Sequence, residues 1–416
     1  MSEFLSLVVM CSLASPAMAV AQDDSETPAG TELASDRPFL DGLYWQLLVS
    51  GFYMFNGYRV SGVYNNLVPG QAQRESYPYT NYMGFGLNFA GGDVMYTGDK
   101  FAVRLDLRWG TAADQLTPIA PVKQGLVAWM PHDRVSIDFG FFSTTFGAEY
   151  ADEWKNANYT RGALYFLRQP FNHMGVRLAA ELAEIVGFMF MLTNGGVGGG
   201  TPIDDNQVPA VGWQFDLAPD GHRSVRRRGL HREGYRKNEL LFGGNHAPTG
   251  ANGNRDWQSF FDLVLSLHFG WFALLFNADY EVTPHGIDLN TGATRQMIFQ
   301  YGHSLALIFD TSDKWSIGVR GEHLSGNEYY RNFGNNVGGV SDPIRDATYG
   351  FLWTGTLTIR YKPVEYLVLS LEGRVEGAGE NIYFSRTSME DVNGIVQPDK
   401  DIYAGIILGA TAHIGN

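Results

Sequence analysis

The chain has 416 residues, of which 14% are aromatic, 18% are charged and 50 are glycine, and its formal net charge is −14. The charged fraction is below the roughly 25% of ordinary soluble domains, and the acidic balance excludes nucleic acid as an expected partner. No segment beyond the N-terminus approaches the ~18 consecutive apolar residues of a membrane helix. Abundant aromatic residues and glycines without such a helix favour an all-β protein.

The N-terminus predicts a secretory signal peptide over residues 1–19. An apolar core at 4–13 is followed by Ala17-Met18-Ala19, which fits the A-x-A cleavage motif. Residues 20–41 are rich in Asp, Ser, Thr and Pro, and we expect them to form a polar leader. The single cysteine, Cys11, belongs to the signal peptide, so the mature chain excludes disulfides, thiolate metal sites and thiol chemistry.

Residues 101–110 show a pattern that recurs along the chain. Their sequence, FAVRLDLRWG, has apolar side chains at every odd position, and Arg104, Asp106 and Arg108 at even positions. Successive side chains of a strand point to opposite faces, so one face is apolar and the other charged. About sixteen such segments occur, centred near residues 50, 89, 106, 126, 138, 177, 189, 212, 240, 262, 275, 302, 319, 355, 370 and 408.

Short and long connections alternate between these segments. The short ones lie at 97–100, 131–134, 311–314 and 362–365 and near Ala183 and Gly270. The long ones lie at 59–81, 113–121, 144–172, 194–207, 245–255, 282–294, 326–347 and 377–400. This alternation is typical of antiparallel up-and-down outer-membrane barrels, with short periplasmic turns and long extracellular loops. Lipid offers an open sheet edge no partner, so the predicted transmembrane barrel, over residues 42–416, must close.

The strand count depends on one basic segment, HRSVRRRGLHREGYRK at 222–237, which lacks alternation where a short turn and a strand are expected. Fourteen to eighteen strands therefore remain open. A soluble β-sandwich, propeller or β-solenoid is the alternative fold. It is less consistent with the aromatic residues at segment ends, which suit a membrane girdle. These are Trp45, Tyr58, Trp109, Trp213, Trp271, Trp315 and Tyr361.

Several motifs between Phe139 and Glu181 point to one family. They are Phe146-Gly147-x-Glu149, NANYTR at 156–161, and Pro170-x-x-His173-x-Gly175-Val176-Arg177, with RGE at 320–322 and EGRVE at 372–376 further along. With these motifs, the sequence from about residue 42 to 415 resembles the OmpL-like family of outer-membrane β-barrel porins. The resemblance implies a diffusion pore for small hydrophilic solutes. The chain ends in TAHIGN and lacks the terminal aromatic residue usual in such barrels.

Charged residues on the polar faces of the predicted strands are the candidate pore lining, because a pore selects by its width and by the charge on its wall. Alternatively, these residues pair with one another and stiffen the wall. They are Arg104, Asp106, Arg108, Asp138, Arg177, Glu181, Arg320, Glu322, Glu372, Arg374 and Glu376.

The connection at 144–172 is the candidate constriction loop, by analogy with porins that fold one loop inward. It carries Glu149, Asp152, Glu153 and Arg161. The alternative is a loop that covers the rim of the barrel.

The sequence thus predicts a passive porin of the Gram-negative outer membrane, whose selectivity depends on interior charges and an inward loop. Expected partners are small hydrophilic solutes, outer-membrane lipid, lipopolysaccharide and the barrel-assembly machinery, with a homo-oligomer possible. No catalytic, cofactor or metal site is predicted, and His173 is expected to pack at a strand end. A plugged or structural barrel, an anchor, a channel for hydrophobic compounds and, less consistently, an outer-membrane hydrolase remain alternatives.

Overall fold

The structure is a computed structural model. It describes residues 42–56, 84–116, 119, 121–196, 208–219, 238–248, 257–284, 297–326, 351–379, 381, 383 and 399–415. The predicted signal peptide (1–19), the leader (20–41), the basic segment (222–237) and Tyr58 lie outside the described residues.

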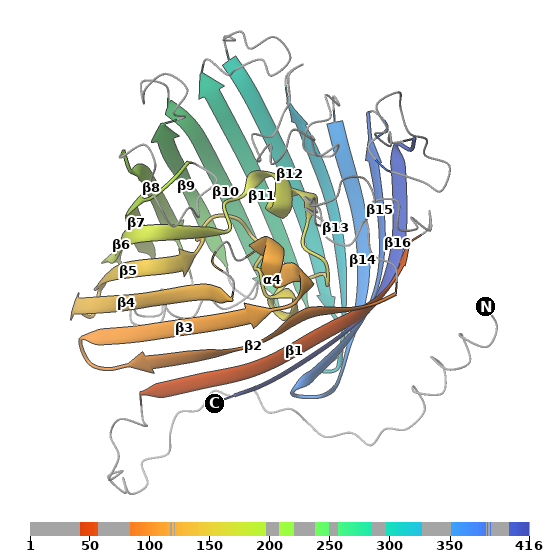
Figure 1. Ribbon diagram of the computed structural model, residues 1–416, viewed down its shortest axis with the longest axis horizontal. Helices are drawn as coiled ribbons and strands as arrows, with labels where there is room; N and C mark the ends of the chain where they lie inside the picture. Colours follow the sequence, from red (N-terminus) through yellow and green to blue (C-terminus); the bar gives the residue numbers. More distant parts are fainter. Residues whose placement is uncertain are drawn as a thin grey trace, which may run out of the picture. The chain divides into compact units, whose positions relative to one another are not determined.

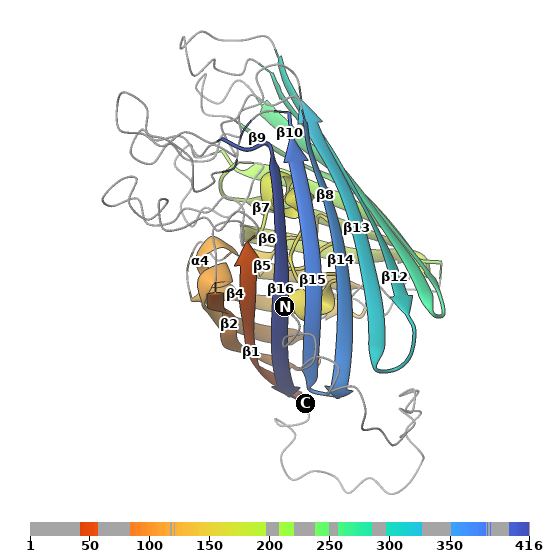
Figure 2. The same cartoon turned by 90° about the vertical axis from the view of Figure 1, so that its right-hand side faces the viewer.

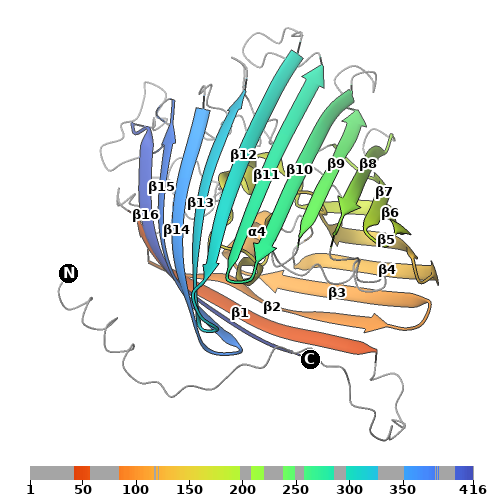
Figure 3. The same ribbon diagram turned by 180° about the vertical axis from the view of Figure 1, so that it is seen from behind.

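The described residues form sixteen antiparallel strands in one closed barrel, in which β16 pairs with β1 (Figures 1 and 3). The strands are β1 (Leu43–Asn56), β2 (Gly84–Thr97), β3 (Phe101–Trp109), β4 (Val122–His132), β5 (Val135–Ser143), β6 (Asn172–Ala183), β7 (Val186–Thr193), β8 (Ala210–Leu217), β9 (Glu239–Pro248), β10 (Trp257–Phe269), β11 (Phe272–Pro284), β12 (Met297–Asp310), β13 (Trp315–Gly326), β14 (Phe351–Val364), β15 (Leu367–Ala378) and β16 (Ile402–Gly415). Every predicted segment centre lies within one strand. The sixteen-stranded barrel is therefore confirmed, and fourteen or eighteen strands and the soluble β folds are wrong.

β3 shows why an alternating sequence forms a membrane wall. Phe101, Val103 and Trp109 are exposed on the outside of the barrel, whereas Asp106 and Arg108 are fully buried inside it. Lipid accepts the apolar face, and the hydrogen-bonded ladders to both neighbouring strands satisfy the backbone. Figure 2 shows β1 beside β16, β15 and β14, where the two ends of the sheet meet.

Several strands run further than the sequence predicted. β14 continues to Val364 across the predicted turn at 362–365. Pro363 lies at a register shift of the β14–β15 ladder, where its missing N–H interrupts no regular pairing. β9 and β11 likewise extend into predicted loops and end at Pro248 and Pro284.

Tryptophans at strand ends fit the predicted girdle, with one correction. Trp45, Trp109 and Trp315 lie at the ends of their strands, and Trp271 lies in the β10–β11 turn. All four are exposed on the outside. Trp213 instead lies in the middle of β8, where its indole N–H donates to a histidine of β9.

Short helices interrupt two predicted loops. The α4 helix (Thr111–Leu116) overlaps the predicted loop 113–121 and packs on β2 and β3. A 3-10 helix, η1 (Glu153–Lys155), and the α5 helix (Ala163–Arg168) lie within 144–172. Such short helices cover too few turns for their periodicity to be recognised in a sequence. Among the described residues, no helix is both long and apolar enough to cross a membrane.

Candidate functional site

Residues 144–171, here called the inner loop, connect β5 to β6 and cross the interior of the barrel (Figures 1 and 3). At one side the backbone N–H of Gly147 donates to Asp262 of β10 over 3.0 Å. At the other side the Tyr159 hydroxyl donates to the carbonyl of Gly51 in β1 over 3.1 Å. The loop is therefore held by strands that are far apart in the strand order.

Carboxylates of β13 and β15 accept hydrogen bonds from the inner-loop backbone. The Glu372 carboxylate accepts from the N–H groups of Tyr159 (2.7 Å) and Thr160 (3.2 Å). Glu322 accepts from the first two N–H groups of α5, both at 3.0 Å. A negative charge is favourable at a helix N-terminus, where these groups have no partner within the helix. Two predicted pore-lining residues thus hold the inner loop.

Guanidinium groups of β14 and β15 donate to carbonyls of the same loop. Arg360 Nη2 donates to the carbonyls of Glu153 and Asn158, both at 2.8 Å. Arg374 Nη1 donates to the Arg161 carbonyl over 2.9 Å. Carboxylates therefore satisfy the donors and guanidiniums the acceptors of an irregular, buried backbone.

Glu149 belongs to the inner loop and pairs with Arg320 of β13, with the Oε1–Nη1 distance 2.5 Å. Its other oxygen accepts from the Gly162 N–H over 2.6 Å. Burial raises the pKa of the Glu149 carboxyl above its ordinary value, and Arg320 opposes this shift. Arg320 Nε also lies 3.3 Å from Glu322.

Asp152 is the centre of a second charged cluster, formed with β2, β3 and β4. Its carboxylate lies 3.2 Å from Arg108, 2.6 Å from Lys123 and 3.4 Å from Lys155. Arg108 in turn lies 2.5 Å from Asp93. Burial opposes ionisation of Asp152, but Arg108 and Lys123 outweigh it and hold the pKa of this carboxyl well below its usual range.

Four of the predicted pore-lining residues form two ion pairs on the wall itself. Arg104 pairs with Asp106 over 2.9 Å, and Arg177 pairs with Asp138 over 2.6 Å. Both carboxylates are buried. Glu181 stands apart from these pairs, half-buried near the β6–β7 turn.

The two remaining predicted loop charges, Glu153 and Arg161, face each other over 3.7 Å. Glu153 also accepts from the Thr411 hydroxyl of β16. The last predicted wall residue, Glu376, pairs with Arg374 and accepts from the Tyr383 hydroxyl over 2.8 Å.

A hydrogen-bonded network of Asn and Asp side chains on β10 and β11 was not predicted from the sequence. Asn277 donates to both Asp262 (2.7 Å) and Asp279 (3.1 Å), and its Oδ1 accepts from Gln169 (2.6 Å) and from the Ala148 N–H (3.0 Å). Alternation on these strands could have placed Asp262, Asn277 and Asp279 inside. Their contact with the inner loop had no signal in the sequence. Asp93, Lys123 and Arg360 were missed as candidates too.

Part of the interior wall is apolar. Its buried side chains come from β2 to β5, β7 to β10 and the inner loop. They are Met95, Ala102, Leu126, Ala128, Met130, Phe142, Phe146, Met189, Met191, Ala210, Ala247 and Phe260. His173 packs beside them, with its ring 6.0 Å from those of Phe142 and Phe146. This is the packing role that the sequence suggested. Within the described part of the chain, no three metal-binding side chains come together.

A family model described as "Putative beta-barrel porin-2, OmpL-like" matches residues 43–397. The chain belongs to this porin family. Its fold and family place it in the outer membrane of Gram-negative bacteria as a channel protein. The resemblance found in the sequence is thereby confirmed.

Solved porin structures share the fold at low sequence identity. The anion-selective porin from Comamonas acidovorans matches with a TM-score of 0.56 and 8% identity, over 89% of this chain and 99% of that chain. The outer-membrane channel DcaP of Acinetobacter baumannii matches with 0.50 and 8%, over 89% and 96%. The trimer form of OmpT from Vibrio cholerae matches with 0.50 and 12%, over 89% and 99%. No curated protein sequence matches this chain.

Proposed function

We propose that this barrel is a passive diffusion channel for small hydrophilic solutes and ions, in which the inner loop narrows the lumen. The course of the inner loop carries the proposal, because hydrogen bonds fix it between β10 and β1. Solutes then cross the part of the interior that the loop leaves open. They move down their gradient, and no covalent bond is made or broken.

We propose that a few partly exposed charges set the selectivity of this channel. Arg104, Glu149 and Lys155 have side chains 12%, 14% and 28% exposed, and Glu181 is half-buried. The other predicted charges are buried and contact the loop or one another. These four charges balance, but half-buried Asp216, Glu239, Glu281 and Asp310 also lie on inward faces of their strands, so this proposal implies a weak preference for cations.

A barrel without an open pore is the second candidate function. The burial of Glu322, Glu372 and Arg374 favours it, because these side chains form hydrogen bonds to the inner loop. A channel for hydrophobic compounds takes support from the apolar interior wall alone. For a hydrolase, His303 and Ser304 are unsuitable because they are adjacent on β12, so their side chains point to opposite faces. His246 Nδ1 lies 3.0 Å from Ser259 Oγ, but the other ring nitrogen of His246 accepts from the Trp213 indole N–H and not from a carboxylate.

Single-channel recording tests these candidates. The refolded full chain is inserted into a planar bilayer with a salt gradient across it. Stepwise currents with a defined reversal potential are expected for the proposed channel. Stable insertion of folded protein without current would refute the open channel and favour the sealed barrel.

We further propose the cellular context that the sequence suggested. The signal peptide at 1–19 is removed, the assembly machinery inserts the barrel, and lipid and lipopolysaccharide surround it. A homo-oligomer is part of this proposal. The trimer form of the Vibrio cholerae OmpT supports it as a precedent within the same fold.

A further inference from the structure

Asp262 of β10 and Asp279 of β11 form a pair of acidic side chains inside the barrel, where the inner loop begins and ends. They occupy directly opposite positions of the β10–β11 ladder, and both are fully buried. Side chains at such positions have Cβ atoms about 4.5–5.5 Å apart. On the neighbouring strands the positions opposite the pair are Gly243 and Gly302, which place no charged side chain beside it. Two carboxylates held this close and away from water cannot both ionise without a large cost.

The groups around Asp279 give it hydrogen bonds but no positive charge. Its carboxyl group accepts from Asn277 Nδ2 over 3.1 Å and from Gln169 Nε2 over 2.9 Å. The cation that α5 brings to this region, Arg168, interacts with Glu281, which lies two positions further along β11. In the described part of the chain, no lysine, arginine or histidine forms an ion pair with Asp279. One carboxyl group of the pair therefore keeps its proton.

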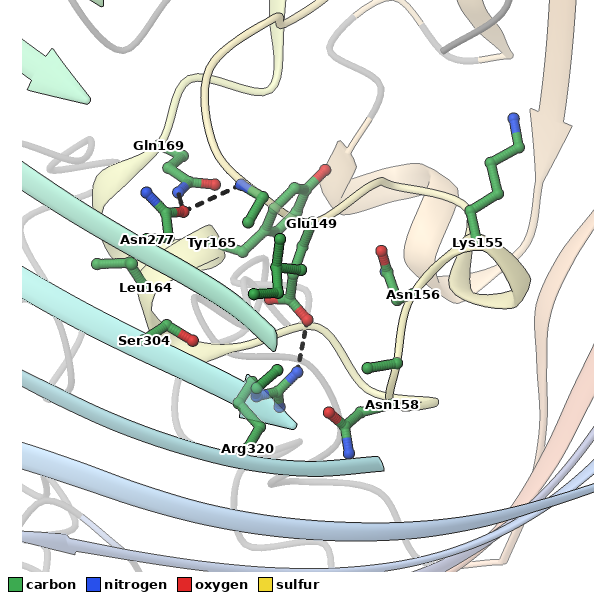
Figure 4. A pocket seen from close by; sticks show the side chains of 14 residues that line it. Glu149, Lys155, Asn156, Asn158, Leu164, Tyr165, Gln169, Asn277, Ser304 and Arg320 are labelled. Carbon is green, nitrogen blue, oxygen red and sulfur yellow. Dashed lines mark hydrogen bonds and ion pairs between the residues drawn. The ribbon is translucent and has the colours of Figure 1, made fainter. Parts of the chain in front are cut away.

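The same network holds both ends of the inner loop. Near the beginning, Asp262 accepts from the Gly147 N–H and Asn277 Oδ1 from the Ala148 N–H, both over 3.0 Å. Near the end, Gln169 donates to Asn277 over 2.6 Å, and Figure 4 shows these two side chains joined by a dashed line. The two ends also touch, because a Cβ atom at Gly147 would overlap the Gln169 amide. A change in the charge of the acidic pair thus acts on both ends of the loop.

We propose that the Asp262–Asp279 pair is a proton-dependent anchor of the inner loop. With one proton, the pair carries a single negative charge and accepts the hydrogen bonds of Gly147 and Gln169. When alkaline pH removes this proton to the solvent, the two carboxylates repel each other and draw in water, and both ends of the loop loosen. The resulting change of conductance with pH rests on the proposed channel function. The proton itself can be measured without a membrane current.

Infrared difference spectroscopy of the full chain in detergent micelles tests for this proton, because a protonated carboxyl group has its own carbonyl band. In Asp279→Asn the amide N–H can donate to Asp262 in place of the proton. Asp313→Asn makes the same change in the exposed β12–β13 turn and is the matched control. At neutral pH we expect Asp279→Asn to lose the band intensity of one carboxyl group and Asp313→Asn to keep it.

Urea unfolding of the same preparations gives a second measurement. The native wild type holds one proton more than the unfolded chain, so its stability should fall as pH rises, whereas Asp279→Asn lacks this proton. We expect the ratio of the wild-type to the Asp279→Asn unfolding constant to rise about tenfold per pH unit between about pH 5 and 7. A constant ratio, or an unchanged infrared band in Asp279→Asn, would overturn the shared proton. Asp262→Asn puts the amide on the other strand and replaces Asp279→Asn should that variant fail to fold.

Single-channel recordings at rising pH test the link between the proton and the loop. We expect the wild-type conductance to increase at alkaline pH, as the infrared band disappears, and the Asp279→Asn conductance to stay constant. A wild-type conductance that stays constant while the band disappears would refute the anchor. Current together with an unchanged band in Asp279→Asn refutes the acidic pair alone. The expected loss of the band without current in any preparation refutes the channel alone.

Discussion

Both sides of the barrel interior pack apolar side chains on the inner loop, but they differ in how many hydrogen bonds they make to its backbone. On β13 to β15, Arg320, Arg360 and Glu372 bond directly to the loop backbone. On β4 to β9, apolar side chains such as Met130 and Met191 form a cluster with Phe146 of the loop, and Gln214 of β8 donates to the Thr145 carbonyl. Both sides have the same alternating strand pattern. They differ in what the inner loop presents to them.

The difference shows that many interior charged side chains form hydrogen bonds or ion pairs with the inner loop. Between residues 156 and 162 the loop has no regular structure, so its peptide groups need partners from the wall. Where the loop instead presents side chains such as Phe146, the wall is apolar. The glycine at position 409 of β16 also lets the inner loop approach the wall closely, because a side chain there would overlap the Tyr159 ring. A charged interior residue is therefore weak support for a selectivity role unless it is also accessible.

Glu372→Ala tests the hydrogen bonds that hold the inner-loop backbone, and we expect it to have the largest effect. It leaves the N–H groups of Tyr159 and Thr160 buried without their acceptor. We expect the free energy of unfolding in urea to fall by about 3–5 kcal/mol and the single-channel conductance to rise as the loop loosens. Glu365→Ala in the exposed β14–β15 turn is the control. Wild-type stability and conductance in Glu372→Ala would show that these hydrogen bonds do not hold the loop.

Met191→Ala tests the apolar side of the comparison. The cavity left by this buried side chain is expected to lower the free energy of unfolding by about 2–5 kcal/mol, measured in the same urea titration. The conductance should stay at its wild-type value, because the backbone bonds of the loop remain. Met297→Ala, at an exposed position, should change neither quantity. A raised conductance in Met191→Ala would mean that apolar packing also positions the loop.

Asp152→Asn tests the charged cluster at β2 to β4 through pH. The depressed pKa of Asp152 means that its ion pairs stabilise the fold above the ordinary value of 3.8 and are lost as pH falls through the folded-state pKa. At neutral pH the variant is expected to be less stable by about 1.5–3 kcal/mol. The difference from wild type should shrink only well below pH 3.8. Asp133→Asn, in an exposed turn, should show no such difference, and a pH-independent gap for Asp152→Asn would contradict the ion-pair account.

Lys155→Glu should give the smallest change in stability and a change in selectivity. Its side chain is 28% exposed, so reversing its charge alters the field that a permeating ion meets. We expect the reversal potential under a salt gradient to shift toward cation selectivity. Lys100→Glu makes the same charge change in the exposed β2–β3 turn. Equal shifts in both variants would assign the effect to net charge rather than to the constriction.

The fold could be predicted almost completely from local patterns. Alternation over residues such as 101–109 has a period of two, and a turn such as 311–314 marks where the chain reverses. Both signals can be recognised from neighbouring residues in the sequence. Strand ends were less accurate. Pro363 looked like part of a turn, but the ladder tolerates it at a register shift.

The sequence by itself determined which residues face inward, because side-chain direction follows strand parity. Only the tertiary structure decided what those residues do. Glu372 and the N–H of Tyr159 are 213 residues apart, and Asp262 and the N–H of Gly147 are 115 apart. No spacing rule joins such positions, since a loop inside a barrel can reach any strand. Closure of the sheet and the path of the inner loop brought these groups together. Several residues that were predicted to line the pore therefore bind the inner loop.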